Sequence, residues 1–388
     1  HDDARYAFYK MIIGIDATNV RDGGGLTYIL ELLTTIVPAN HGISKIVIWG
    51  SSQTLAKLPY IAWLKKENPP ALNKGLFVRT FWQRFKLSHA ARKSQCDVLF
   101  IPGGSYKGTF KPIVAMSQNL LPFERSELNR FGISLIWFKL NILRYTQSHS
   151  FRFADGVIFL TEYAKQAVLK VTGPLSGDTI VIAHGLSSRF RMRLKAQRPI
   201  GDYTESNPYR LLYVSSIYPY KHQWHLIEAV HILRTQGLPI KLDLIGPAFP
   251  ATLPRLKATI AKFDPEKIWV QYHGAIPYET LNNFYAQSDL GVFASSCENM
   301  PIILLEAMAS ALPIACSNCG PMPEILGDSG LYFDPENPLE IAQSLRMYID
   351  SPELRNEKAK ASVERCQKYT WERCAEETFA FLSKVGRK

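Results

Sequence analysis

The sequence is poor in cysteine and has no long uninterrupted apolar run. Six cysteines in 388 residues are too few and too scattered for a disulfide scaffold, and such usage is typical of a reducing compartment. Cys316 and Cys319 form the only close pair, and without a second pair they do not predict a zinc site. The longest apolar stretch, Phe131 to Leu143, is too short to span a bilayer and contains Lys139. We therefore expect a soluble, cytoplasmic protein.

The first ten residues also lack a targeting pattern. His1 to Lys10 is polar with no apolar centre, so it does not predict a signal peptide, and Met11 is the expected natural start. The composition excludes disorder, because the chain contains 7 Trp, 18 Tyr and 20 Phe residues. The length predicts two or three globular domains.

Positive charge is concentrated in the first half of the chain. Residues 1–199 contain 27 Lys and Arg against 12 Asp and Glu, a net charge of +15. The remainder contains 18 against 22, a net charge of −4. This asymmetry indicates that the first half meets an anionic partner such as nucleic acid, phospholipid or a phosphorylated substrate.

Short apolar runs alternate with amphipathic helical patterns from Met11 onward. Strands that are apolar on both faces and separated by helices predict a parallel, doubly wound sheet. In the first half we expect a helix near Leu26–Ile36 and strands at Ile12–Ala17, Lys45–Trp49, Phe77–Phe81, Val98–Ile101, Pro112–Met116, Val157–Leu160 and Thr179–Ala183.

A polar segment, residues 187–209, interrupts the alternation, and its later part is expected to be a linker. The same pattern then restarts, with strands expected at Leu211–Val214, Lys241–Ile245, Ile268–Tyr272, Leu290–Ala294 and Pro313–Cys316. The sequence thus predicts two Rossmann-like α/β domains, 11–190 and 205–370, facing a central cleft. The last helix, 371–386, is expected to pack back on the first domain.

The strongest chemical signal is a pair of glutamates around a predicted helix. Glu298 precedes the helix, and Glu306 is the only charged residue between Pro301 and Ala309. A carboxylate on an apolar helix is costly to bury unless it is paired or binds something. It is also a good acceptor for vicinal sugar hydroxyls. The alternative is a helix-capping Glu298 and a structural ion pair for Glu306.

This pattern resembles the family-4 retaining, nucleotide-sugar-dependent glycosyltransferases with the GT-B fold. The resemblance rests on Glu298, Glu306, Pro313 and the stretch 320–324, and it covers most of Leu211–Leu382. It implies that Glu298, Asn299 and Met300 hold the donor sugar and diphosphate, and that Glu306 holds the ribose. Met300 and Pro301 stand where the family usually has Phe-Gly, so one backbone donor is lost at Pro301.

The resemblance also assigns a role to Lys221, which follows a predicted strand. The family usually places Gly-Arg at Ser215-Ser216 and a lysine five residues after the arginine, and both cations neutralise the diphosphate. Here Lys221 is retained and Ser216 replaces the arginine. Leaving-group stabilisation is then expected from Lys221, backbone amides and Arg21. Without the resemblance, Lys221 would be read as a solvated lysine at a helix start.

Further candidates lie in the first half. Gly24 and Gly25 belong to a glycine turn before a helix, where backbone can approach phosphate, although such turns are common. Gln118 and Asn119 follow a predicted strand where many relatives have His-Asp, and amides cannot act as general bases near pH 7. That fits a front-face retaining mechanism, whereas the alternative is a polar loop. His184 also follows a strand, but a lone histidine is more often structural.

Two further features of the sequence predict whether the protein needs a cofactor and whether it binds a membrane. The chain has no D-x-D sequence, so we expect no metal requirement and no other cofactor. A basic and apolar stretch, Arg125–Arg152, favours docking to an anionic bilayer through Trp137, Phe138 and several cations, and the alternative is a core helix with a solvated face. The cations are Arg130, Lys139, Arg144 and Arg152, with Arg79, Arg84, Lys86, Arg92 and Lys93 upstream.

The sequence therefore predicts a retaining hexosyltransferase that uses a nucleoside-diphosphate sugar. Its expected acceptor is a saccharide or lipid-linked saccharide in bacterial O-antigen, capsule or exopolysaccharide synthesis. We expect a cytoplasmic protein attached peripherally to the inner face of the plasma membrane, and no nucleic-acid partner. The alternatives are a non-catalytic GT-B scaffold, a basic nucleic-acid- or membrane-binding protein, and a GT-B epimerase or phosphorylase.

Overall fold

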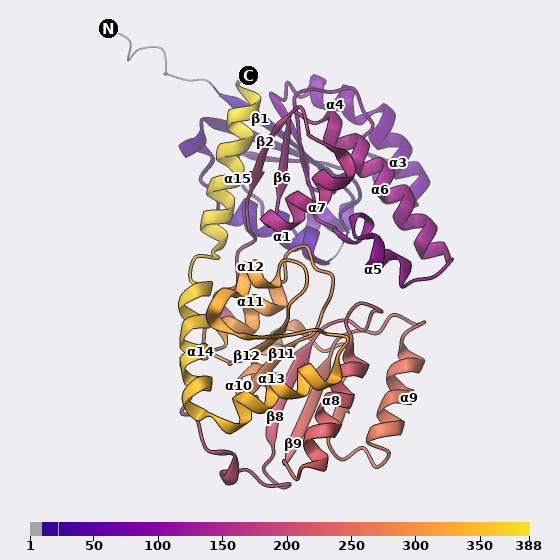
Figure 1. Cartoon of the computed structure of the whole chain (residues 1–388). Coiled ribbons are helices and arrows are strands. Elements are labelled where there is room, and N and C mark those ends of the chain that lie inside the picture. The colour runs from indigo at the N-terminus through magenta and orange to yellow at the C-terminus, as the bar shows by residue number, and fades with distance from the viewer. Residues whose placement is uncertain (1–9, 22) are drawn as a thin grey trace. The chain divides into compact units, whose positions relative to one another are not determined.

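The computed structural model describes residues 10–21 and 23–388, and it divides into two compact units. Unit 1 comprises residues up to Phe123, Ile133–Gly185 and Tyr369–Lys388, and unit 2 comprises Glu124–Gly132 and Leu186–Lys368. Figure 1 follows the chain from indigo to yellow through both units. The predictions for residues 1–9 lie outside the described residues.

Unit 1 contains a seven-stranded sheet in which all neighbouring strands are parallel, with the order β3-β2-β1-β4-β5-β6-β7. The inner strands are entirely buried or nearly so, as expected for a sheet covered by helices on both faces. The strands are β1 (Met11–Ala17), β2 (Ile43–Gly50), β3 (Leu64–Glu67), β4 (Val98–Ile101), β5 (Ile113–Met116), β6 (Gly156–Phe159) and β7 (Asp178–Val181).

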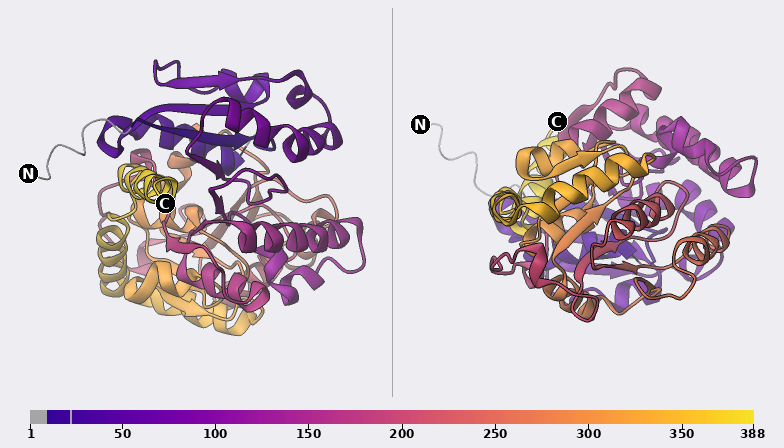
Figure 2. Two further views of the ribbon diagram at one scale, coloured as in Figure 1. Left: turned by 90° about the horizontal axis from the view of Figure 1, so that it is seen from above. Right: turned by 60° about the horizontal axis from the view of Figure 1, so that its bottom comes forward.

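Side-chain caps fix where several helices of unit 1 begin. Ser134, Thr161 and Thr370 each accept a hydrogen bond from a backbone N–H in the first turn. The helices are α1 (Gly23–Thr35), α2 (Ser52–Ala56), α3 (Leu76–Phe85), α4 (Leu87–Lys93), α6 (Leu135–Phe153), α7 (Glu162–Thr172) and α15 (Trp371–Gly386). The long magenta ribbon of α6 can be followed in Figure 2, and the yellow ribbon of α15 is visible near the C-terminus in its left panel.

Unit 2 contains a six-stranded parallel sheet with the order β10-β9-β8-β11-β12-β13. Its strands are β8 (Tyr209–Val214), β9 (Ile240–Ile245), β10 (Val270–Tyr272), β11 (Leu290–Phe293), β12 (Ile314–Ser317) and β13 (Leu331–Phe333). Its helices are α5 (Arg125–Asn129), α8 (Gln223–Thr235), α9 (Leu253–Phe263), α10 (Leu281–Gln287), α11 (Ile302–Ala309), α12 (Met322–Leu326), α13 (Pro338–Asp350) and α14 (Pro352–Cys366).

The order of strands in unit 2 positions its functional edge. Numbered along the unit, the strands run 3-2-1-4-5-6, so the winding direction reverses between β8 and β11. The loops that leave the carboxyl ends of these two strands pass to opposite sides of the sheet and open a crevice where ligands bind in such folds. A ligand-binding site is therefore expected among the residues that follow β8 and β11.

The two predicted parallel α/β sheets are confirmed, but the prediction of one strand was wrong. Phe77–Phe81 is part of helix α3, and its aromatic side chains face solvent instead of a sheet neighbour, with Phe77 91% exposed. Residues 124–132, which the sequence interpretation included in 11–190, belong to unit 2. Helix α15 belongs to unit 1, where it packs on α1 and β4. Within the described residues, no helix has the length and apolar character needed to cross a membrane.

Candidate functional site

The structure joins the two charged residues that the sequence singled out at the edge of the unit 2 sheet. Lys221 lies between β8 and α8, Glu298 lies between β11 and α11, and the Lys221 Nζ forms an ion pair with the Glu298 Oε1. The two side chains are only 9% and 16% exposed, respectively. Such a pair exists because each charge offsets the cost of burying the other.

Hydrogen bonds tie together the two loops that carry this pair. The Tyr213 hydroxyl, on β8, donates to the Lys221 carbonyl at 2.9 Å. The Ser296 N–H donates to the Tyr220 carbonyl at 2.9 Å, which links the loop after β11 to the loop after β8. The positions of Lys221 and Glu298 are thus set by the sheet as well as by their mutual attraction.

Glu306 lies on helix α11, 2% exposed, in an otherwise apolar stretch. The Tyr278 hydroxyl donates to its Oε1 at 2.7 Å, and the Tyr285 hydroxyl donates to its Oε2 at 3.4 Å. Burial raises the pKa of Glu306 to about 7, and the two tyrosine hydrogen bonds oppose that shift. The Arg189 guanidinium lies 4.6 Å from the centre of the Tyr278 ring and also lowers the pKa of Glu306.

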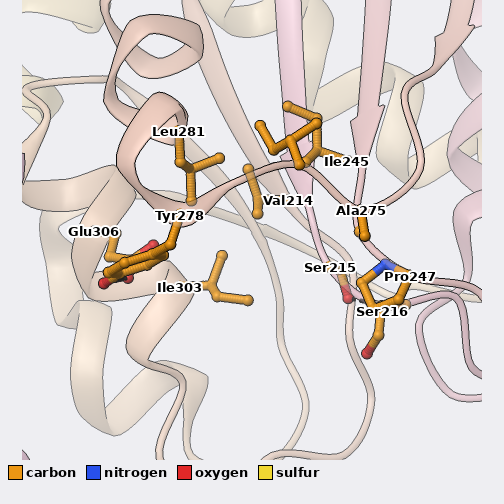
Figure 3. Close-up of a pocket in the computed structure, with 12 residues that line it drawn as sticks. Val214, Ser215, Ser216, Ile245, Pro247, Ala275, Tyr278, Leu281, Ile303 and Glu306 are labelled. Atoms are coloured by element: carbon orange, nitrogen blue, oxygen red, sulfur yellow. Dashed lines mark hydrogen bonds between the residues drawn. The ribbon is translucent and has the colours of Figure 1, made fainter. Parts of the chain in front are cut away.

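A pocket of about 190 Å³ opens beside Glu306. Its walls come from the ends of β8 and β9, the loop after β10, and helices α10 and α11. Figure 3 shows Tyr278 against Glu306 at one end and Ser215, Ser216 and Pro247 at the other. The lining residues are Val214, Ser215, Ser216, Ile245, Gly246, Pro247, Ala275, Ile276, Tyr278, Leu281, Ile303 and Glu306. A mostly apolar pocket with one carboxylate suits a flat ring that carries hydroxyl groups.

Two residues shape the floor of this pocket. Gly246 has φ of 142°, and a Cβ there would approach the Ser215 carbonyl oxygen to 2.2 Å, so the position requires glycine. The Ser216 carbonyl accepts a hydrogen bond from the Gln223 Nε2 at 3.1 Å, which fixes the loop after β8. Ser216 lines the pocket and brings no positive charge to it.

The loop before α11 is the least conventional part of the site. Asn299 and Met300 are almost buried, and Pro301 is the N-cap residue of α11 instead of a member of its first turn. Pro301 brings no N–H to this helix end, as the sequence indicated. The ligand-binding roles of Asn299, Met300 and Pro301 stay predictions.

The candidates of the first half belong to unit 1. Gly24 and Gly25 lie in the first turn of α1, and a Cβ on Gly25 would contact the Gln118 Oε1 at 3.3 Å, so these two candidates are neighbours. The Asn119 Oδ1 accepts from the Leu121 N–H in a local turn. His184 is 7% exposed and packs against Tyr28 and Trp371, with ring centroids 4.9 and 5.7 Å away, and burial lowers its pKa to about 4. His184 is therefore neutral at pH 7 and packs in the core of unit 1.

The sequence interpretation missed several residues of the site. Tyr278 and Tyr285 hold Glu306, while His222 and Ser296 flank the ion pair. A single tyrosine carries no local sequence signal for such a contact, so these contacts emerge only from the fold. Within residues 10–21 and 23–388 there is also no group of three His, Cys, Asp or Glu side chains placed to hold a metal ion.

The ionisation of Glu306 gives a stability prediction. Because its folded-state pKa of about 7 exceeds the ordinary value of 4.5, its stabilising contribution is complete below pH 4.5 and is lost as pH rises through 7. The ionised group costs up to about 3 kcal/mol above pH 7. We expect Glu306→Gln to melt at a higher temperature than the unaltered protein at pH 8 and with no advantage at pH 5. An equal difference in melting temperature at the two pH values would contradict the assignment.

Comparison with known proteins finds a family that resembles most of unit 2. Residues 202–365 match the family described as glycosyl transferases group 1. The O-antigen chain mannosyltransferase B of Escherichia coli is 25% identical over 167 residues, which cover 43% of this chain and 44% of that protein. The chain thus spans less than half the length of this curated relative.

Solved structures match nearly the whole chain. Anabaena HepE in complex with UDP superposes with a TM-score of 0.68 at 16% identity, covering 97% of this chain and 100% of HepE. WaaG, a glycosyltransferase involved in lipopolysaccharide biosynthesis, gives a TM-score of 0.66 at 14% identity, covering 96% and 99% of the two chains. The protein therefore has the GT-B fold, and its residues 202–365 are similar to the group 1 glycosyl transferases.

Proposed function

We propose that this protein is a retaining glycosyltransferase that moves a hexose-type sugar from a nucleoside-diphosphate sugar to a saccharide or lipid-linked saccharide. The observation that carries the proposal is the Lys221–Glu298 ion pair at the reversal point of the unit 2 sheet, together with the pocket lined by Glu306 in the same unit. The two charged groups and the pocket match the parts of a nucleotide sugar: sugar, diphosphate and nucleoside.

The pocket is the place for the nucleoside. Its apolar walls suit the base, and the Glu306 carboxylate can accept hydrogen bonds from the two ribose hydroxyls. Tyr278 donates to that carboxylate in the structure, so ribose must share or replace the tyrosine hydrogen bond. HepE was crystallised with UDP, which makes UDP the first ligand to try here.

Lys221 and Glu298 are proposed to act on the diphosphate and the sugar. The Lys221 ammonium neutralises charge that develops on the departing diphosphate, and it takes more of this task because Ser216 stands where relatives have arginine. Glu298 holds the sugar, as the resemblance implies. In a retaining front-face transfer the departing phosphate oxygen accepts the proton of the acceptor hydroxyl. The amides Gln118 and Asn119 are then not needed as bases.

Unit 1 is proposed to receive the acceptor. When the charges are counted by unit, the whole net charge of the protein lies in unit 1. Unit 1 has 24 Lys and Arg against 13 Asp and Glu, a net charge of +11, whereas unit 2 has 21 against 21. At the carboxyl end of β1, Arg79 donates to the Thr18 carbonyl at 3.4 Å, and its buried Nε has no partner among the described residues. Burial, and then the charge of Arg21, lower the pKa of Arg79. An anionic group such as the phosphate of a lipid-linked saccharide would relieve this repulsion.

The pathway proposed is assembly of a bacterial surface glycan. It is supported by the similarity to an O-antigen mannosyltransferase and by the shared fold with WaaG. A non-catalytic scaffold of the same fold is the alternative. The retained Lys221, Glu298 and Glu306 argue against it, because a scaffold has no need for two nearly buried charged sites.

The donor site is tested by comparing UDP with uridine. We expect UDP to raise the melting temperature of the protein, since a ligand at a concentration one hundred times its dissociation constant adds about 2.7 kcal/mol to the free energy of unfolding. Lys221→Ala should weaken UDP binding at least tenfold and leave uridine binding within twofold. Glu306→Ala should weaken both ligands. Lys257→Ala, an exposed residue of α9, is the matched control. Unchanged UDP affinity in folded Lys221→Ala would refute the diphosphate role.

Metal independence is a second test of the proposal. Since Lys221 is the proposed counter-charge of the diphosphate, transfer from the nucleotide sugar should continue in excess EDTA at more than half of the initial rate. The measurement is release of nucleoside diphosphate with and without the chelator. Complete loss on chelation, restored by magnesium or manganese, would contradict the proposal.

Membrane attachment is proposed for unit 1, with a corrected set of residues. Arg130 is not a free surface cation, because it is in unit 2 and pairs with Glu127 and Glu336. The remaining surface is a stripe along one face of α6, the "α6 stripe", formed by Leu135, Phe138, Ile142 and Tyr145, which are 52–89% exposed. No acidic residue occurs between Glu127 and Asp155, so the α6 stripe and its cations suit an anionic bilayer.

We therefore expect the protein to sediment with anionic liposomes at low salt and not with neutral ones. Each Lys or Arg near the anionic membrane surface contributes about 1 kcal/mol to the free energy of binding, and salt screens this attraction. Lys139→Glu with Arg144→Glu should reduce sedimentation at least fivefold and leave UDP binding unchanged. Lys107→Glu with Lys170→Glu makes the same charge change at exposed positions outside α6 and should have less than half that effect. Equal losses in the two double variants would show that net charge, and not the α6 stripe, determines binding.

A further inference from the structure

A short segment from the first half of the sequence contributes to the loops of the donor site. Residues 124–132, here the 124–132 segment, belong to unit 2 although the chain on either side of them belongs to unit 1. Glu127, on helix α5 of this segment, is 7% exposed. A carboxylate so deeply buried needs partners that offset the loss of water.

One of these partners is the hydroxyl of Ser296. Ser296 Oγ lies 2.6 Å from the Glu127 Oε2 and 2.8 Å from the His222 Nε2. A carboxylate only accepts and a hydroxyl has one proton, so Ser296 donates to Glu127 and accepts from the N–H of His222. Burial, together with the charge of Arg130, lowers the pKa of His222 to about 3, so its ring is neutral. The hydrogen bond to Ser296 then assigns the ring proton to Nε2.

This hydrogen-bond chain reaches both proposed donor-site residues. His222 follows Lys221 directly, and Ser296 lies two residues before Glu298. The hydroxyl of Ser296 therefore bridges the loop that carries the lysine and the loop that carries the glutamate. His222 has φ of 53°, a left-handed conformation that costs free energy in a non-glycine residue and persists only when its surroundings hold it.

The Glu127 end of the chain is itself fixed. Arg130 donates to Glu127 through Nε at 2.7 Å and also pairs with Glu336. Phe131, the next residue, packs its ring against Tyr218, Tyr220 and Phe249, with centroids 6.1–6.4 Å away. Two of these aromatic residues, Tyr218 and Tyr220, come from the loop that leads to Lys221.

We infer that Glu127 is a positioning residue of the donor site. Its carboxylate orients the Ser296 hydroxyl, which orients His222, and this chain keeps the Lys221 ammonium and the Glu298 carboxylate where the diphosphate and the sugar are to bind. The inference rests on the proposed function, because it names what holds the two charged groups of that site. Glu127 acts on the diphosphate end, whereas the nucleoside pocket around Glu306 does not depend on it.

The test compares UDP and uridine affinities by calorimetry. Glu127→Ala should weaken UDP binding about tenfold and leave uridine binding within twofold. Glu127→Gln keeps an acceptor for Ser296 and should restore UDP affinity to within threefold. Ser296→Ala should reproduce the Glu127→Ala result, and it serves if Glu127→Ala does not fold. Arg125→Ala, an exposed residue of the same helix, is the control.

A second readout does not depend on donor binding. The ¹⁵N spectrum of the His222 ring should show the proton on Nε2, and its signal should shift in Glu127→Ala but not in Arg125→Ala. Unchanged UDP affinity in folded Glu127→Ala, or equal weakening of UDP and uridine, would overturn the inference. If the unaltered protein binds no UDP, the proposed function is wrong. The His222 spectrum alone then decides whether Glu127 orients the hydrogen bonds of Ser296 and His222.

Discussion

Lysine and glutamate side chains that are nearly buried must offset each other's loss of water, and in this protein that requirement joins two loops from different strands. Lys221 and Glu298 are 77 residues apart in sequence and meet because the sheet of unit 2 reverses direction between β8 and β11. In the proposed function, a diphosphate that approaches Lys221 competes with the Glu298 carboxylate for the same ammonium. Two further contacts hold the loops together. The Ser296 N–H donates to the Tyr220 carbonyl, and the Ser296 hydroxyl donates to the Glu127 carboxylate.

Glu306 satisfies the same physical demand in another way. Among the residues that the structure describes, no cation forms an ion pair with it; instead, two tyrosine hydroxyls donate to its carboxylate, and burial raises its pKa to about 7. In the proposed function, the ribose hydroxyls would supply the hydrogen bonds that the two tyrosines supply in the structure. One unit thus contains two carboxylates with different partners, one paired with a cation and the other with neutral donors.

Much of this arrangement could be predicted from the sequence. Alternating apolar runs and helical patterns indicated both parallel sheets, and Glu306 stood out as the only charged residue of an apolar helix that Glu298 precedes. Lys221 was identified only through the family resemblance. Strand β3 was missed because its sequence, Leu-Lys-Lys-Glu, is mostly polar at a sheet edge. Residues 77–81 were misread because aromatic residues favour strands locally, whereas α3 presents them to solvent. The placement of Glu127 in unit 2, and of Tyr278 on Glu306, depends on contacts distant in sequence.

The central claim is that the carboxyl edge of the unit 2 sheet binds a nucleoside diphosphate. A crystal structure of the protein with UDP tests it most directly. We predict the base in the pocket lined by Val214 and Ile245, the ribose hydroxyls within hydrogen-bond distance of Glu306, and the β-phosphate on Lys221 Nζ. Electron density for UDP at another place, with the Lys221–Glu298 and Tyr278–Glu306 contacts unchanged, would contradict the account.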